Sequence, residues 1–255
     1  MELVLLGLIS FFTSVVSGML GLGGAVLLIP SYLYIPSLFG VNPLDVKNIS
    51  GMTSLQVFSA SMVGALVHRQ KGVVNTQLVL VIGIPMAIAS LSGALASGAV
   101  DPNFIITIFA LMAVLGAVLV VMKRENLEIE NNELKFSKAG AIGIATVVGF
   151  FGGIVGAPGA FLISPLMITV LNIPTRVTIG STLGIVLLSA FSASVGKIVV
   201  GQVSVLPTTI AVLSSLPGVY LGSKFSHRIQ TRTLRWALAL LISIVGIQML
   251  YKIIQ

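Results

Sequence analysis

Ten apolar stretches follow one another along the chain, most of them separated by short polar interruptions. They cover residues 3–17, 24–40, 49–67, 74–99, 102–122, 139–152, 159–172, 177–196, 203–223 and 233–251. Uncharged apolar stretches of about 20 residues are typical of transmembrane helices. A membrane β-barrel would instead show strands of about ten residues in which apolar and polar positions alternate, and no stretch has that pattern. The pattern therefore predicts an all-α polytopic membrane protein.

Glycines, instead of polar residues, separate the first two stretches. Residues 17–30 read SGMLGLGGAVLLIP and include Gly18, Gly21, Gly23 and Gly24. Glycine is a poor helix former, and irregular backbone inside a membrane is tolerated only where protein covers it or a wet cavity adjoins it. We expect two short helices that meet at a glycine tip near the membrane midplane. The helix that begins near Gly24 would present free N–H groups and the positive end of its dipole to an anion.

One polar stretch is long and divides the chain. Residues 123–138, KRENLEIENNELKFSK, contain four basic and four acidic residues. The two flanking parts resemble each other, since GMLGLGGAVLLIP (18–30) aligns with GIVGAPGAFLISP (153–165) at an offset of 135. Further matches in the same order are Thr53-Ser54 with Ser181-Thr182, Gly72 with Gly201, and Gly93 with Gly222. Because internal duplication is common in secondary transporters, we predict a first repeat (1–122), a linker (123–138) and a second repeat (139–255).

The distribution of lysine and arginine predicts the orientation of the repeats. With the linker in the cytoplasm, and with each glycine-broken region returning to the side it started from, 11 basic residues face the cytoplasm and 3 face outside. A single crossing at each region gives 8 and 6. The positive-inside rule favours the first arrangement. Each half then has three further crossings, so the repeats are inverted, the linker is cytoplasmic and both termini lie outside the cell.

Composition and charge narrow the function classes. The chain is 56% hydrophobic and 8% charged, against roughly 25% charged residues in a soluble protein. The formal net charge of +7 would suggest nucleic-acid binding in a soluble protein, but here the cations lie in short loops, so we expect no nucleic-acid partner. The absence of cysteine excludes disulfides and thiolate metal sites, and we expect no metal or other cofactor. With Glu2 and no basic n-region, the N-terminus predicts no cleaved signal.

Nothing in the sequence favours an enzyme. Hydrolysis inside a membrane needs a nucleophile with a base, or a set of metal ligands. Both histidines, His68 and His227, lie in basic loops, and neither Gly-x-Ser-x-Gly nor His-Glu-x-x-His occurs. No Asp or Glu lies inside an apolar stretch, which argues against a carboxylate proton relay. We therefore predict that the chain is not an enzyme.

Three motifs carry a resemblance to a known family. They are GMLGLGGAVLLIP with its second copy, the Thr/Ser pair in SGMTSL and TIGSTL, and HRQKGVVN at residues 68–75. In these motifs the sequence resembles the sulfite exporter TauE/SafE family of membrane permeases. The resemblance implies export of small anions, such as sulfite, other sulfur oxyanions or organosulfonates like sulfoacetate. Pro158, where the family often has glycine, removes one N–H donor, and Gly196-Lys197 replaces Val67-His68, so the two half-sites are not equivalent.

The predicted anion site combines the glycine tips with the duplicated hydroxyl pair. Its members are Gly21, Gly23, Gly24, Gly156 and Gly159 at the tips, and Thr53, Ser54, Ser181 and Thr182 on the following helices, with Asn48, Gln56 and Arg176 as weaker candidates. The alternative for these residues is structural. Glycines such as Gly149 and Gly152 let helices pack closely, and hydroxyls bond to their own backbone or to a neighbouring helix. Arg176 and Lys197 flank an apolar stretch, where a basic residue is more often an anchor at the membrane interface.

The leading hypothesis is an anion exporter that works by alternating access of the two repeats. An anion channel with a glycine-lined constriction, or a permease for a different small solute, is the alternative. Saturable flux with counterflow exchange would separate a transporter from a pore. We further expect a multi-pass protein of the cell membrane that forms a homodimer.

Overall fold

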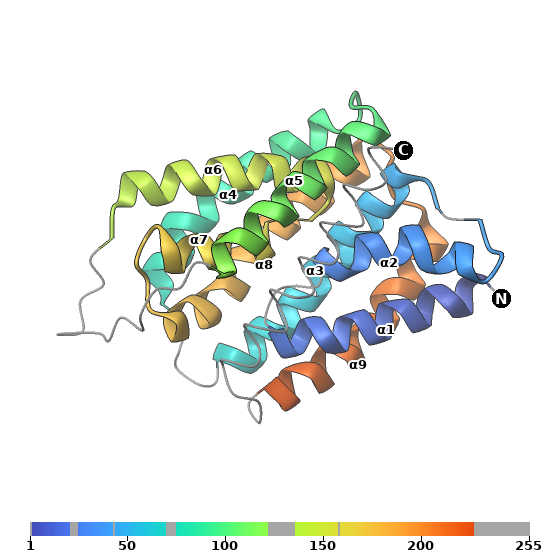
Figure 1. Cartoon of the computed structure of the whole chain (residues 1–255), viewed down its shortest axis with the longest axis horizontal. Helices are drawn as coiled ribbons and strands as arrows, with labels where there is room; N and C mark the ends of the chain where they lie inside the picture. The colour runs from blue at the N-terminus through green and yellow to red at the C-terminus, as the bar shows by residue number, and fades with distance from the viewer. Residues whose placement is uncertain are drawn as a thin grey trace.

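The structure, a computed structural model, describes residues 2–20, 25–42, 44–69, 75–121, 136–157 and 159–226. Within these ranges the chain forms helices and no strand (Figure 1). The helices are α1 (Glu2–Leu20), α2 (Ala25–Leu38), α3 (Val46–Arg69), α4 (Thr76–Ala96), α5 (Pro102–Val121), α6 (Lys138–Val155), α7 (Ala160–Thr169), α8 (Thr175–Val199) and α9 (Val205–Ser226). All of them except α2 and α7 are long and apolar enough to cross a membrane, which gives seven candidate spans. The predicted all-α polytopic fold is therefore confirmed, while the predicted stretch 233–251 and most of the linker lie outside the described residues.

The two short helices follow the glycine-rich regions. Helix α2 has 14 residues and α7 has 10, so they are about 21 and 15 Å long. Neither reaches the roughly 30 Å of a bilayer core. Helices α1 and α6, which precede them, have 19 and 18 residues and are close to that length. Each glycine-rich region therefore joins a helix of spanning length to a shorter one.

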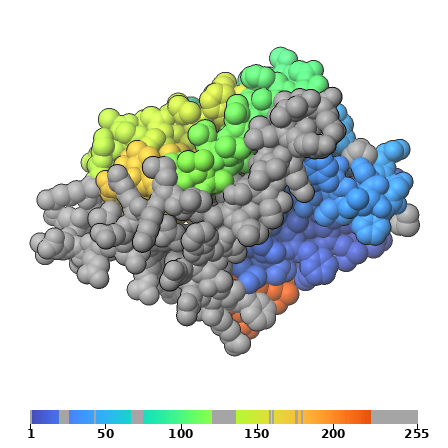
Figure 2. Space-filling model, viewed as in Figure 1, coloured from blue at the N-terminus to red at the C-terminus, as the bar shows by residue number. Residues whose placement is uncertain are grey.

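Packing between helices mainly joins the two sequence halves. Helix α1 packs on α9, α4 packs on α6 and α8, and α3 packs on α8 and α9. In Figure 1, α1, α2, α3 and α9 lie on one side of the molecule, and α4 to α8 lie on the other. Figure 2 shows the same division on one face, with blue α1 and α2 apart from green and yellow α5 and α6. The halves 1–122 and 139–255 are therefore interlocked in space.

Close approaches of glycine to a neighbouring backbone occur in matched pairs. At four glycines, an added Cβ would meet a carbonyl oxygen of the partner helix: Gly18 with Val219, Gly153 with Ser90, Gly93 with Phe150, and Gly222 with Val15. The contact of Gly18 with Val219 corresponds to that of Gly153 with Ser90, because Gly153 follows Gly18 by 135 residues and Val219 follows Ser90 by 129. The contact of Gly93 with Phe150 corresponds to that of Gly222 with Val15 by the same two offsets. Small residues of this kind let membrane helices approach closely. A duplication would produce matched contacts of this kind, and the division into two repeats stays a prediction.

The corresponding helices of the two halves run in opposite directions. Helices α1 and α9 are parallel, because Phe11 faces Gly218 and Val15 faces Gly222. By the same kind of contact, α4 is parallel to α6 and α8. Helices α3 and α8 are antiparallel, because the start of α3 meets the end of α8 near Ile154 while Gly64 lies against Leu183. This is the relation that an inverted duplication produces; which face is cytoplasmic stays a prediction.

Candidate functional site

The second glycine tip begins where α6 ends. Gly156 closes α6 in the left-handed conformation (φ 75°), and its N–H donates to the carbonyls of Gly152 and Gly153. Only glycine adopts this conformation without strain. Ser50 of α3 packs against Gly156 and leaves no room for a side chain there. The tip is therefore fixed in position by the start of α3.

Helix α7 begins near the middle of the bundle. Its N-terminal cap is Gly159 (φ 58°), and a Cβ on this residue would meet Val148 and Met86, which lie near the midpoints of α6 and α4. After α7, Leu171 lies against Gly140 at the start of α6, so the hairpin returns to the end it came from. The first N–H groups of a helix have no acceptor within it. At this end of α7 the N–H groups of Gly159 and Leu162 donate to the carbonyls of Ala157 and Gly159. The donors that can face a ligand deep inside the bundle are therefore the N–H groups of residues 160 and 161.

The expectation of two short helices beside each glycine tip is wrong for the first helix of each half, because α1 and α6 have 19 and 18 residues. Helix α6 runs unbroken through Gly149, Gly152 and Gly153 to Val155 and is about 27 Å long. Gly149 and Gly153 pack against the backbone of Met86 and Ser90 on α4. Close contact with α4 stabilises a glycine-rich segment that is intrinsically a poor helix. The packing role is therefore correct for these glycines, and the break in the chain lies at 156–159.

In the second half, the predicted hydroxyl pair faces two different neighbours. Ser181 Oγ accepts the backbone N–H of Asn75 at the start of α4 (3.0 Å). Thr182 Oγ1 donates to the carbonyl of Thr178 (2.7 Å) and accepts from Ser164 Oγ of α7 (3.2 Å). Thr182 therefore lies beside the half-length helix α7, while Ser181 helps to fix the start of α4.

In the first half, the two predicted hydroxyls differ in their hydrogen bonding. Ser54 Oγ donates to the carbonyl of Gly51 (2.8 Å), which is the bond to its own helix that was the structural alternative. Thr53 is fully buried, and its Oγ1 has no hydrogen-bond partner within the described residues. Thr53 is therefore the member of this pair that keeps a donor and acceptor for a ligand.

The two hydroxyl pairs do not meet in one site. Gly64 of α3 lies against Leu183 of α8, and the two helices are antiparallel. Thr53 precedes Gly64 by eleven residues, which corresponds to about 16 Å along the axis. The structure therefore separates the predicted hydroxyls into two half-sites, Thr53 and Ser54 on α3 and Ser181 and Thr182 on α8, where Thr182 contacts α7.

A buried polar network that sequence reasoning did not find surrounds Gln56. Tyr32 Oη donates to Gln56 Oε1 (2.7 Å) and lies 2.6 Å from Ser10 Oγ. Gln56 Nε2 donates to Ser14 Oγ (3.3 Å), and all four residues are buried. Gln56 therefore ties α3 to α1 and α2. The available signal was the spacing of Ser10 and Ser14, which places both on one face of a helix.

The other predicted residues add little to the geometry. Asn48 is half-buried in the first turn of α3. Gly21, Gly23, Gly24 and the side chain of Arg176 lie outside the described residues. Among the described residues, no group of three or more His, Cys, Asp or Glu side chains could hold a metal ion.

The expectation that Lys197 is an interface anchor is wrong. Its side chain is fully buried and donates to Ser97 Oγ, Gln202 Oε1 and the carbonyl of Ile154. These acceptors come from two turns and from the end of α6, so Lys197 has partners inside the protein that a lysine at a lipid boundary lacks.

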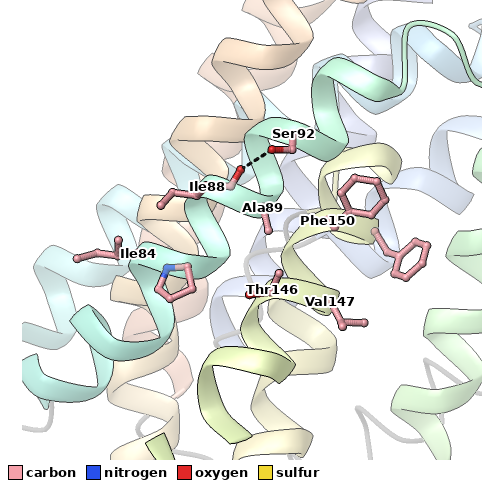
Figure 3. Close-up of a pocket in the computed structure, with 9 residues that line it drawn as sticks. Ile84, Ile88, Ala89, Ser92, Thr146, Val147 and Phe150 are labelled. Carbon is pink, nitrogen blue, oxygen red and sulfur yellow. Dashed lines mark hydrogen bonds between the residues drawn. The ribbon is translucent and has the colours of Figure 1, made fainter. Parts of the chain in front are cut away.

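An apolar groove lies between α4 and α6, with a volume of about 590 Å³. Figure 3 shows Ile84, Ile88, Val147 and Phe150 along it. The hydroxyls of Ser92 and Thr146, which line the groove, bond to carbonyls of their own helices. The groove therefore offers apolar contact and no free hydroxyl proton, which suits lipid and not an anion.

Comparison with known proteins gives the family. The profile described as "Sulfite exporter TauE/SafE" matches residues 6–249. Three Bacillus subtilis (strain 168) proteins, each described as a "Probable membrane transporter protein", are similar over nearly their whole lengths. YunE is 22% identical over 99% of this chain and 98% of its own. YdhB is 24% identical over 97% and 100%, and YjnA is 25% identical over 98% and 99%, of this chain and their own respectively. No solved structure matches. The chain, a multi-pass membrane protein with seven candidate spans, belongs to the sulfite exporter TauE/SafE family of membrane transporters.

Proposed function

We propose that the chain is a secondary transporter that exports a small anion by alternating access of its two halves. The anion class that we propose is the sulfur oxyanions and organosulfonates, of which sulfite and sulfoacetate are examples. Support for transport comes from the family match and from the three similar transporters. Support for sulfur chemistry comes from the description of the family.

The position of the α7 N-terminus is the observation on which the proposal rests. Half-length helices whose N-termini face an anionic group near the midplane are a recurring device of secondary transporters. In this chain, α7 begins beside the midpoints of α4 and α6, and its cap residue Gly159 has no side chain to cover the free N–H groups. An oxyanion can approach this backbone closely. Helices α2 and α7 also contact each other, so the two short helices meet between the halves.

The charges of the chain agree with an anionic substrate. The seven acidic residues lie at helix ends, in turns or in the linker: Glu2 is the first residue of α1, and Asp45 and Asp101 precede α3 and α5. None of the carboxylates that the structure describes is therefore placed where it would repel an anion in the middle of the bundle.

The test is anion binding followed by flux. The purified protein is heated with sulfite, thiosulfate, sulfoacetate, acetate or chloride at matched ionic strength. A ligand of the native state stabilises it by about 2.7 kcal/mol at a hundredfold excess over its dissociation constant, so the transported anion should raise the unfolding temperature. Flux of that anion into proteoliposomes should then saturate and show counterflow exchange. Flux without counterflow would indicate a channel, and no shift with any anion would contradict the proposal.

Thr53 provides a prediction that separates function from stability. An unpaired buried hydroxyl costs about 1–3 kcal/mol, so Thr53→Val, which keeps the shape of the side chain, should leave the unfolding temperature unchanged or raise it. If the hydroxyl binds the anion, the same substitution should lower flux at least tenfold and remove the anion-induced thermal shift. Ser90→Ala is the matched control, because Ser90 Oγ is also buried without a partner among the described residues but lies on α4. Normal flux in Thr53→Val would exclude Thr53 from the site.

A further inference from the structure

Lys197 is a buried cation with no free donor. It lies in the last turn of α8, and none of its surface is exposed. Its Nζ lies 2.8 Å from Ser97 Oγ, 2.8 Å from the carbonyl oxygen of Ile154 and 2.9 Å from Gln202 Oε1. An ammonium group has three N–H donors, so each of them is used. The acceptors come from the α4–α5 turn, the last turn of α6 and the α8–α9 turn, which we call the Lys197 end of the molecule.

The three acceptors are neutral, although the group they surround is charged. The two acidic residues nearest in sequence to these elements, Asp45 and Asp101, are exposed and accept the backbone N–H groups of Lys47 and Asn103. The carbonyl of Ile154 lies at the negative end of the α6 dipole and offsets part of the charge. Burial of a cation without a counter-ion costs several kcal/mol, and an apolar side chain of similar size is often more stable in such a place. Stability alone therefore does not account for a lysine at this position.

A second cation, from the start of α3, contacts the same α4–α5 turn. Lys47 is half-buried at the start of α3, and its Nζ donates to the carbonyl of Gly98 (2.9 Å), the residue after Ser97. Two ammonium groups thus bind adjacent residues of the α4–α5 turn. Clustered charges of one sign raise the local concentration of ions of the opposite sign, so the Lys197 end favours the approach of anions.

The partners of Lys197 also close this end of the molecule. Gln202 Nε2 donates to the carbonyl of Ser97 (3.0 Å), and Ser50 Oγ of α3 donates to the same Ile154 carbonyl as Lys197 (3.4 Å). Gly51 of α3 packs against the backbone of Gln202. This network joins α3, α4, α6 and the α8–α9 turn beside the Gly156 tip. Access to the start of α7 from the Lys197 end requires these turns to separate.

We infer that Lys197 is an anion-binding residue of the gate at this end of the molecule. The inference rests on the proposed anion transport. An arriving anion replaces Gln202 and Ser97 as acceptor on Nζ, and the turns that these residues held together separate. The ammonium and the anion attract each other through their opposite charges, and the neutral acceptors Gln202 and Ser97 lack this attraction. The anion therefore binds the open gate better than the closed one, and a ligand shifts an equilibrium toward the state it binds better.

Two substitutions test the inference from opposite sides. Lys197→Met removes the cation and keeps the length of the side chain, and Gln202→Glu supplies a permanent carboxylate beside it. Lys197→Met should unfold at the wild-type temperature or above it. In Gln202→Glu the ion pair with Lys197 offsets the lost donation of Nε2 to the Ser97 carbonyl, so its unfolding temperature should stay close to that of the wild type. Both should raise the KM for the transported anion at least tenfold when it is supplied at the Lys197 end, and much less when it is supplied at the linker end. The comparison uses right-side-out and inside-out vesicles with the anion that wild-type protein carries. Lys224→Met is the control, because Lys224 is an exposed lysine in the last turn of α9 and has no part in this network; it should keep KM within twofold.

Each result decides the matter. Side-dependent changes in KM for Lys197→Met and Gln202→Glu support the gate, because a purely structural lysine would not distinguish the two faces. Wild-type KM at both faces in Gln202→Glu would overturn the inference even if Lys197→Met failed to fold. A wild-type protein that carries no anion of the panel would instead overturn the proposed function itself.

Discussion

At the scale of single residues, the two half-sites differ in chemistry. Ser10, Ser14 and Tyr32 correspond, by the offset of 135, to Ala145, Gly149 and Met167 in the second half. Gln56 corresponds to Gly184 by the offset of 128 that relates Thr53-Ser54 to Ser181-Thr182. Ala145, Gly149 and Met167 are also buried. A polar network in the first half is thus replaced by apolar packing in the second. The two half-sites therefore differ in this polar network. The sequence comparison had placed the difference elsewhere, at Pro158 and Lys197.

We predict that Tyr32→Phe destabilises the protein. The substitution leaves Gln56 Oε1 without its donor and removes the contact with Ser10 Oγ, and an unsatisfied buried polar group costs about 1–3 kcal/mol. The unfolding temperature in detergent should fall. Tyr220→Phe is the matched control, since Tyr220 is 52% exposed and should change stability by less than about 0.5 kcal/mol.

A double-mutant cycle shows whether this loss comes from the network. In Tyr32→Phe combined with Gln56→Leu, both partners are apolar, so the double variant should lose less stability than the sum of the two single variants. Residues in one hydrogen-bond network commonly show a coupling of about 0.5–3 kcal/mol. Strict additivity would mean that Tyr32 and Gln56 act independently.

At the scale of helices, the sequence predicted where each helix begins and ends better than it predicted the role of the glycines within it. The predicted stretch 74–99 became α4 and 203–223 became α9, because long apolar runs fix where a chain crosses a membrane. The glycines of 149–159 were harder, since glycine serves both close packing and helix breaks. Only the partner decides between these roles: Gly153 has α4 against it, whereas Gly159 caps a new helix. Partners of this kind depend on residues far away in sequence.

Two glycines of α6 should respond in opposite ways to alanine. At Gly153 a Cβ would overlap the backbone of Ser90, whereas at Gly143 nothing lies within 4 Å. Overpacking costs typically about 1–3 kcal/mol, so Gly153→Ala should lower the unfolding temperature. Gly143→Ala should raise it slightly, because alanine favours a helix interior over glycine by about 0.5–1 kcal/mol. Equal effects at both positions would contradict the packing of α6 on α4.

At the scale of the whole molecule, the main surprise is how the halves share their contacts. The sequence indicated two repeats joined by a linker, but it did not indicate that α1 packs on α9 or that α4 packs on α6. It also grouped four hydroxyl residues into one site that the antiparallel α3 and α8 keep about 16 Å apart. Repeat number can be found by aligning a chain with itself, whereas the choice of partner depends on surface fit between helices.

A disulfide across the halves tests this arrangement. The chain has no cysteine, and an ideal Cβ on Gly7 of α1 lies 4.0 Å from Cβ of Ser214 on α9, within the range for a disulfide. Gly7→Cys with Ser214→Cys should therefore form a cross-link on mild oxidation. After proteolysis within residues 123–138, the two fragments should stay in one band on a non-reducing gel. The control pair, Gly7→Cys with Gly143→Cys, should separate into two bands.

The interlocked halves have a consequence for how the protein is made. Helix α9 begins about 185 residues after α1 ends, and ribosomes add about 5–20 residues per second. The first helix thus waits roughly 10–40 s in the bilayer before its main partner is synthesised, with its glycine- and serine-containing face uncovered. During that interval the nascent chain depends on lipid, the insertion machinery or chaperones to occupy the face that α9 later covers. Substitutions at the α1–α9 contact should therefore reduce the amount of protein that escapes degradation more than they reduce the activity of the molecules that finish folding.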